Sequence, residues 1–135
     1  MVADFGVALI QNHLTSSAIS HHTSTKEGGG TLRWMAPELL VGDPLKKSCD
    51  LYSFAITAWE LFSNGKIPFS AVPDLAIYNI VGERKKRPSR PASLESDDLW
   101  TIICRCWFSD PEKRPIFSDV QRRLKTLCGT GKYLF

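Results

Sequence analysis

Side chains able to do chemistry stand in three places along the 135 residues: the tripeptide Asp4-Phe5-Gly6, a histidine-containing loop and a basic run. The tripeptide alone indicates little, because three common residues often meet by chance and Asp4 beside Gly6 can simply form a turn. His21 and His22 adjoin in a Gly/Ser/Thr-rich stretch without a positioned third ligand. A solvated loop is therefore a better interpretation of these histidines than a metal site.

The basic run covers residues 84–87, with Arg90 just beyond it. Such a run is typical of a nuclear-localisation signal or a nucleic-acid patch. Prolines interrupt it, however, and charge is its only support, so we favour a solvated loop and expect no nucleic-acid partner. The net charge of +3 is mild and agrees with that interpretation.

Composition indicates one globular domain, since 43% of the residues are hydrophobic and 23% are charged. No apolar run reaches the length of a membrane span, and the first six residues are not a signal peptide. The four cysteines form no CxxC pair, which favours reduced and mostly buried thiols. We therefore expect an intracellular, cytoplasmic protein without a membrane partner, and leave the nucleus open.

Apolar spacing predicts a mainly α-helical chain after a Ser/Thr/His/Gly-rich loop over residues 7–33. The central helix is expected from Ser48 to the Asn64-Gly65 stop. It is apolar on nearly all sides and should be buried, with partners all round. Later segments predict a short helix over 73–81 ended by Gly82, a helix capped by Ser96, and a last helix with Phe117, Val120, Leu124 and Leu127 on one face.

Four motifs in a fixed order connect these elements: DFG at 4–6, GTLRWMAPE at 30–38, DLYSFA at 50–55, and CW at 106–107 with DPEKRP at 110–115. Together they resemble the protein kinase catalytic domain, from its DFG motif to the end of the domain. The resemblance implies a partial kinase domain over 1–135, with an activation segment over 4–38 and a helical subdomain over 39–135. The implied fold is the helical C-lobe portion of a two-lobed α+β fold, with the N-lobe and the catalytic loop absent.

The resemblance also implies roles for single residues. Asp4 would hold Mg²⁺ against the ATP phosphates once the full domain is present, and Phe5 would separate active from inactive arrangements. Glu38 and Arg114 would form a structural ion pair, for which a bidentate arginine is suited. Asp50, apart from the resemblance, is favoured at the start of the central helix by the helix dipole. The resemblance adds backbone hydrogen bonds from the catalytic loop, which is expected to be absent here. The pocket beside the phosphoacceptor would be shaped by Gly30, Thr31 and Trp34.

Hydroxyl residues crowd the expected activation segment. A phosphate there can pair with arginine and order the loop. The candidates are Thr23, Ser24 and Thr25, with Thr15, Ser16, Ser17 and Ser20 upstream. For any one of them, an ordinary loop residue is the favoured interpretation.

The sequence GTLRWMAPELL is similar to the corresponding motif of the tyrosine kinase-like group, whose members mostly phosphorylate Ser and Thr. The glycine-rich loop, the ATP-contacting lysine and the catalytic-loop aspartate would all precede DFG in family order, so we expect no catalytic residue here and no activity of this chain alone. ATP and Mg²⁺ are the implied cofactors, although this chain should not bind them usefully by itself. Implied partners are a protein substrate or an upstream kinase segment. The alternative is a non-catalytic decoy or interaction module, and the oligomeric state stays open.

Overall fold

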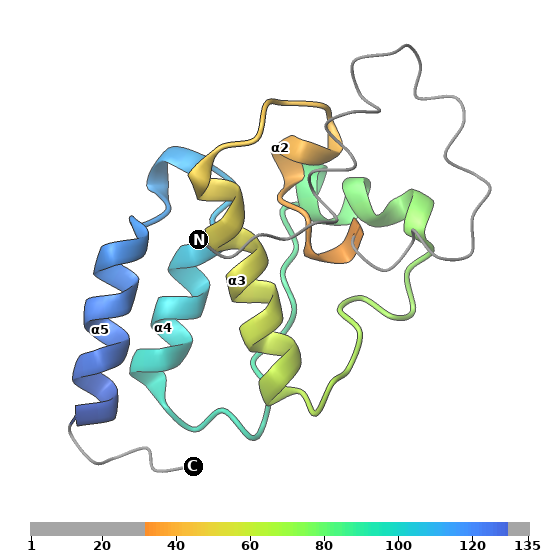
Figure 1. The fold of residues 1–135 in the computed structure, drawn as a ribbon. Helices are drawn as coiled ribbons and strands as arrows, with labels where there is room; N and C mark the ends of the chain where they lie inside the picture. Colours follow the sequence, from red (N-terminus) through yellow and green to blue (C-terminus); the bar gives the residue numbers. More distant parts are fainter. Residues whose placement is uncertain (1–31, 130–135) are drawn as a thin grey trace.

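The computed structural model describes residues 32–129, which form a helical body with no strand in that range (Figure 1). The prediction of a mainly α-helical fold is confirmed. Figure 1 shows α3, α4 and α5 side by side, with α4 between the other two, and α4 packs on both neighbours. The elements in chain order are η1 (Leu32–Trp34), α2 (Pro37–Leu40), α3 (Lys47–Phe62), η2 (Asp74–Ala76), η3 (Asn79–Glu83), α4 (Asp97–Cys106), η4 (Pro111–Lys113) and α5 (Phe117–Gly129).

Helix α3 is the centre of the core, and Tyr52, Ala55 and Ile56 on it are completely buried. The helix ends where the sequence predicts, because Asn64 and Gly65 both take the left-handed conformation (φ 56° and 72°) that stops a helix. Its burial is incomplete. Leu61 is 69% exposed, so the described residues do not cover the helix on every side.

Helices α4 and α5 carry the apolar faces that the spacing predicts. The Ser96 hydroxyl caps α4 by accepting a hydrogen bond from the Leu99 amide at 3.1 Å. Ile103 and Cys106 of α4 are fully buried in the core cluster shared with α3. On α5 only Val120 is buried, so this helix lies at the rim of the core.

The short helix expected over 73–81 differs from the prediction. It consists of the 3-10 turn η2 followed by the π-turn η3, and it continues past Gly82 to Glu83. Gly82 does not stop the helix. A glycine at this position instead allows the Tyr78 ring to approach the backbone closely. A Cβ atom there would lie 2.5 Å from the Tyr78 ring, which occupies that space.

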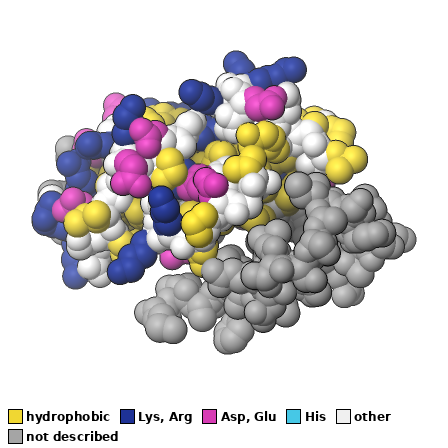
Figure 2. Space-filling model, turned by 90° about the horizontal axis from the view of Figure 1, so that it is seen from above, with side chains coloured by type: hydrophobic (Ala, Val, Ile, Leu, Met, Phe, Trp, Pro, Cys, Tyr) yellow, Lys and Arg dark blue, Asp and Glu magenta, His cyan; other side chains and the backbone are white. Residues whose placement is uncertain are grey.

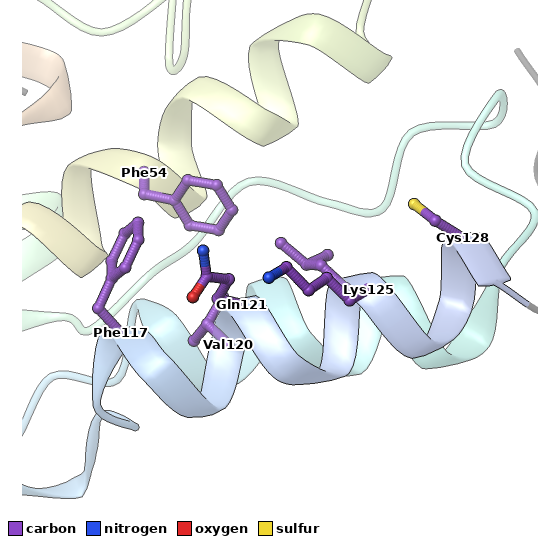
Figure 3. Close-up of a pocket in the computed structure, with 7 residues that line it drawn as sticks. Phe54, Phe117, Val120, Gln121, Lys125 and Cys128 are labelled. Carbon is purple, nitrogen blue, oxygen red and sulfur yellow. The ribbon is translucent and has the colours of Figure 1, made fainter.

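A shallow apolar groove of about 270 Å³ runs between α3 and α5 (Figure 3). The rings of Phe54 on α3 and Phe117 on α5 meet edge to face across it, with centroids 6.4 Å apart. Val120 and Leu124 line it further along α5, and Lys125 supplies a cation at its edge. The groove therefore exposes part of the apolar face of α3 that the sequence predicts to need a partner.

Candidate functional site

The structure describes Trp34, Glu38, Asp50 and Arg114 among the residues singled out by the sequence. The DFG residues Asp4, Phe5 and Gly6, the pocket residues Gly30 and Thr31, and the phosphosite candidates Thr15, Ser16, Ser17, Ser20, Thr23, Ser24 and Thr25 lie outside the described residues. The site is therefore built from the segment that follows Thr31 and from what holds that segment in place.

Glu38 and Arg114, which are 76 residues apart in the sequence, form a two-point ion pair. The Arg114 guanidinium donates to Oε1 at 2.6 Å and to Oε2 at 2.9 Å. It also donates to the carbonyls of Ser48 and Phe108, each at 2.9 Å. The Arg114 side chain is 0% exposed and the Glu38 side chain 10%, so this is a buried pair whose geometry ties α2 to α3 and to the chain before η4.

Local sequence places both partners. Pro37 opens α2 with a fixed φ, and Glu38 follows in its first turn. On the other side, the Asp110 carboxylate accepts from the Glu112 amide at 3.0 Å and caps η4, after which Arg114 leaves in extended conformation. The DPEKRP motif is thus a short capped turn that presents its arginine to the core.

The electrostatics of the pair favour the charged form of Glu38. Burial is the largest single influence and raises the pKa of this carboxyl. The hydrogen bonds and charge of Arg114, with a backbone N–H and the Cys49 thiol, together outweigh burial and bring the pKa below its ordinary value of 4.5. The Cys49 thiol also donates to Oε1 at 3.4 Å. Burial, together with the neighbouring Glu38 charge, raises the pKa of Cys49, so this thiol stays protonated and supports the carboxylate as a donor.

Tyr52 joins the ion pair to a second, half-buried arginine, Arg87. The guanidinium carbons of Arg114 and Arg87 lie 5.2 Å and 5.1 Å from the centroid of the Tyr52 ring, within the range of cation–π attraction. Arg87 also donates to the carbonyls of Trp107 and Val81, both at 2.8 Å. This role of Arg87 was not predicted, because the residue lies in a run interpreted as a solvated loop.

That basic run is divided by the fold. Arg87 turns inward, and Arg90 pairs with Asp97 at 2.5 Å and with the Leu94 carbonyl at 2.9 Å. Arg84, Lys85 and Lys86 remain exposed. On the face seen in Figure 2, basic and acidic side chains alternate over most of the described surface, and no large basic patch stands out.

The segment 32–36 is fixed to α3 through Trp34. Its indole N–H donates to Glu60 at 2.9 Å, and its carbonyl accepts from the Ser53 hydroxyl at 2.9 Å. Its neighbour Arg33 reaches the other way, to the chain between α3 and η2. Neither Glu60 nor Arg33 was singled out from the sequence, although an acid in the apolar end of α3 and a cation in an otherwise apolar segment were available signals.

Asp50 lies exposed in the first turn of α3, where a carboxylate is favoured by the helix dipole. Within residues 32–129, no group of three or more His, Cys, Asp or Glu side chains is placed to hold a metal ion. No helix in this range is long and apolar enough to cross a membrane.

Comparison with known proteins decides the family. The model of the family described as "Protein tyrosine and serine/threonine kinase" matches residues 1–124. The chain belongs to this protein kinase family. The helical body is accordingly the C-lobe portion of the kinase fold, and Glu38 is the last residue of the kinase A-P-E motif.

Its relatives include kinases of different specificities. The chain is 36% identical over 119 residues to serine/threonine/tyrosine-protein kinase HT1 of Arabidopsis thaliana, with 88% of the chain and 28% of that protein covered. It is 34% identical to proto-oncogene tyrosine-protein kinase ROS of Rattus norvegicus (92% and 5% covered). Probable serine/threonine-protein kinase drkC of Dictyostelium discoideum is 37% identical (73% and 13%). The chain thus spans less than a third of the length of these curated relatives.

Replacing Glu38 with Gln should strongly destabilise the chain, because the fully buried Arg114 cation would lose its counter-charge. We expect the free energy of unfolding to fall by about 3–5 kcal/mol, as for other broken buried pairs. Asp119→Asn is the matched control, since Asp119 and Arg122 also meet at 2.6 Å but are 38% and 72% exposed. Its effect should stay below about 1 kcal/mol in urea unfolding. Equal losses of unfolding free energy in both variants would contradict a buried, structural ion pair between Glu38 and Arg114.

The lowered pKa of Glu38 predicts an acid-sensitive contribution to stability. A carboxyl with a folded-state pKa below its ordinary value of 4.5 stabilises the folded state above that pH, and this contribution is lost as the pH falls through the folded-state pKa. The difference in unfolding free energy between the wild-type chain and Glu38→Gln should therefore be largest near neutral pH and shrink below pH 4.5. Urea titrations at several pH values measure it. A difference that grows on acidification would show that the carboxyl pKa is raised.

Proposed function

We propose that this chain is the C-lobe part of a serine/threonine protein kinase of the tyrosine kinase-like group, acting in intracellular signalling. In the complete kinase it would help transfer the γ-phosphate of ATP to Ser or Thr of a protein. The observation that carries the proposal is the kinase family match over residues 1–124. The Ser/Thr preference is supported by Thr31 in GTLRWMAPE, whose hydroxyl faces the catalytic aspartate in kinases of that specificity. The relatives' names include both specificities.

The proposal divides the work between this chain and an upstream part of a longer kinase. Phosphoryl transfer depends on positioning and on electrostatic stabilisation. The upstream part would supply the glycine-rich loop, the ATP-contacting lysine and the catalytic base. When bound, Mg²⁺ neutralises charge on the phosphates, and Asp4 of this chain is the residue proposed to hold it.

The described residues would serve the protein substrate. The pocket beside the phosphoacceptor is proposed to comprise Gly30, Thr31 and Trp34. Trp34 is held by Glu60 and Ser53 of α3, and the Glu38–Arg114 pair anchors the chain that follows. These contacts support a rigid backbone over residues 34–38, next to the proposed substrate pocket, because each involves a partly or fully buried side chain.

The apolar groove between α3 and α5 also supports a division of the kinase between this chain and a further segment of the polypeptide. Phe117 in its lining is 57% exposed and leaves apolar surface that a further segment of the kinase polypeptide would cover (Figure 3). The relatives are several times longer than this chain and have room for such a segment. The groove also supports the second candidate, a non-catalytic interaction module, in which another protein would take that place. For either role we propose a cytoplasmic location, where ATP and signalling proteins are available.

A phosphotransfer assay tests the proposal. The 135-residue chain alone should transfer no label from ATP to a general protein substrate, since a positioned base alone contributes about 10²–10⁴-fold in rate. Joined to the in-frame upstream coding sequence, which should encode an HRD-type catalytic loop and a lysine-bearing strand, it should phosphorylate proteins on Ser and Thr. Asp4→Asn should abolish that activity.

Three results would count against the proposal. Label transfer by the chain alone that disappears in Asp4→Asn would contradict its expected inactivity. Phosphotyrosine as the only product would refute the Ser/Thr preference. Genomic DNA without a kinase motif in any upstream frame, allowing for introns, would leave the interaction module as the better function.

A further inference from the structure

Arg33 makes an unusual set of contacts for a residue in a three-residue turn. Its guanidinium donates to the carbonyls of Pro68 at 3.0 Å, Phe69 at 2.5 Å and Val72 at 2.7 Å. It also pairs with the Asp74 carboxylate at 2.7 Å, and its side chain is only 11% exposed. All four acceptors lie 35 to 41 residues further along the chain, between α3 and the start of η2.

The loop 63–73 depends on this cation for its shape. Phe69 has a φ of 51°, a left-handed conformation that a bulky side chain takes only where its surroundings impose it. Its carbonyl accepts from both Arg33 and the Val72 amide. Three carbonyl dipoles that face one another repel unless a donor lies between them, and the two terminal nitrogens of the Arg33 guanidinium are those donors.

The other side of the same dipeptide is anchored just as firmly. Trp34 bonds to Glu60 and Ser53, so residues 33 and 34 together connect α3, the loop 63–73 and η2. The loop buries Pro68, but apolar side chains on it and on η2 are exposed. Ile67 is 53% exposed, and Leu75 in η2 is 92% exposed. Figure 2 shows hydrophobic side chains gathered at the right-hand end of the molecule, the end at which η2 and η3 lie in Figure 1.

We propose that Arg33 is a positioning residue for the protein substrate. It holds the loop 63–73 and η2 beside residues 32–34, so that a substrate polypeptide would contact both of these segments at once. This role rests on the proposed function, because the pocket is the one assigned to the phosphoacceptor. Arg33 itself touches neither ATP nor the reacting atoms; it acts through the backbone that it holds.

Kinetics of the kinase joined to its upstream segment separate this role from general stability. Arg33→Met keeps much of the side-chain length and removes all four bonds. We expect the KM for a protein substrate to rise at least tenfold, with kcat and the KM for ATP within twofold of the parent. Asp74→Asn should raise the KM less than threefold, because the three carbonyl contacts remain. Arg122→Met, at an exposed arginine on α5, is the control and should change none of these values.

Hydrogen exchange on the 135-residue chain tests the same contacts without any activity. In Arg33→Met the amides of residues 63–74 should exchange at least tenfold faster, while those of α4 stay unchanged and report an intact fold. If that variant does not fold, Arg33→Lys is measured instead, with a smaller increase confined to the same residues because one charge remains.

Each outcome decides a different point. Unchanged exchange in 63–74 would overturn the proposed contact role of Arg33. Faster exchange with kcat or the KM for ATP altered in parallel would make Arg33 a general structural residue and refute substrate positioning. An inactive parent kinase would refute the proposed function, and the substrate role with it. Faster exchange in such a protein would still show that Arg33 holds the loop.

Discussion

A fully buried guanidinium is the constraint on which the rest of this C-lobe depends. The Arg114 side chain has no exposed surface, and a buried cation is tolerated only when acceptors surround it. Glu38 supplies the charge and the carbonyls of Ser48 and Phe108 complete the set. Satisfying this one side chain therefore fixes where α2, the start of α3 and the turn at η4 lie relative to each other.

Tyr52 extends that constraint to the loop after η3. Its ring is fully buried and faces both Arg114 and Arg87, although Arg87 has no carboxylate partner among residues 32–129. Carbonyl oxygens and an aromatic face replace the missing anion. Two cations near one ring would repel each other in isolation, so the arrangement holds only because Glu38 and the carbonyls neutralise them. The two arginines consequently form one cooperative unit.

Parts of this arrangement could be predicted from the sequence, and the limits have physical causes. The helices follow from apolar spacing and from caps such as Ser96, and the pairing of Glu38 with Arg114 was expected from the kinase motifs. The contacts of Arg33 and Arg87 were not, because their acceptors are mainly backbone carbonyls, which every residue has and no motif marks. Gly82 was interpreted as a helix stop because the sequence does not show the position of the Tyr78 ring. That ring lies where a Cβ atom of residue 82 would be, so the position favours glycine. Helical spacing predicts that Leu61 needs a partner, but it does not show which neighbour would cover this side chain, and Leu61 is exposed here.

Arginine, and not lysine, suits all three linking positions. Each of Arg33, Arg87 and Arg114 makes four hydrogen bonds from one planar group, and each has at least one acceptor that is 20 or more residues away in the sequence. A lysine ammonium has three donors at a single point, so at least one acceptor would lose its partner in each case. A loop has few backbone hydrogen bonds of its own, and a guanidinium that gathers its carbonyls gives it the rigidity that a strand would get from a sheet. Residues 32–129 contain no strand whose backbone hydrogen bonds could fix the loops beside the proposed substrate pocket. Hydrogen bonds from arginine side chains to the loop carbonyls fix them instead.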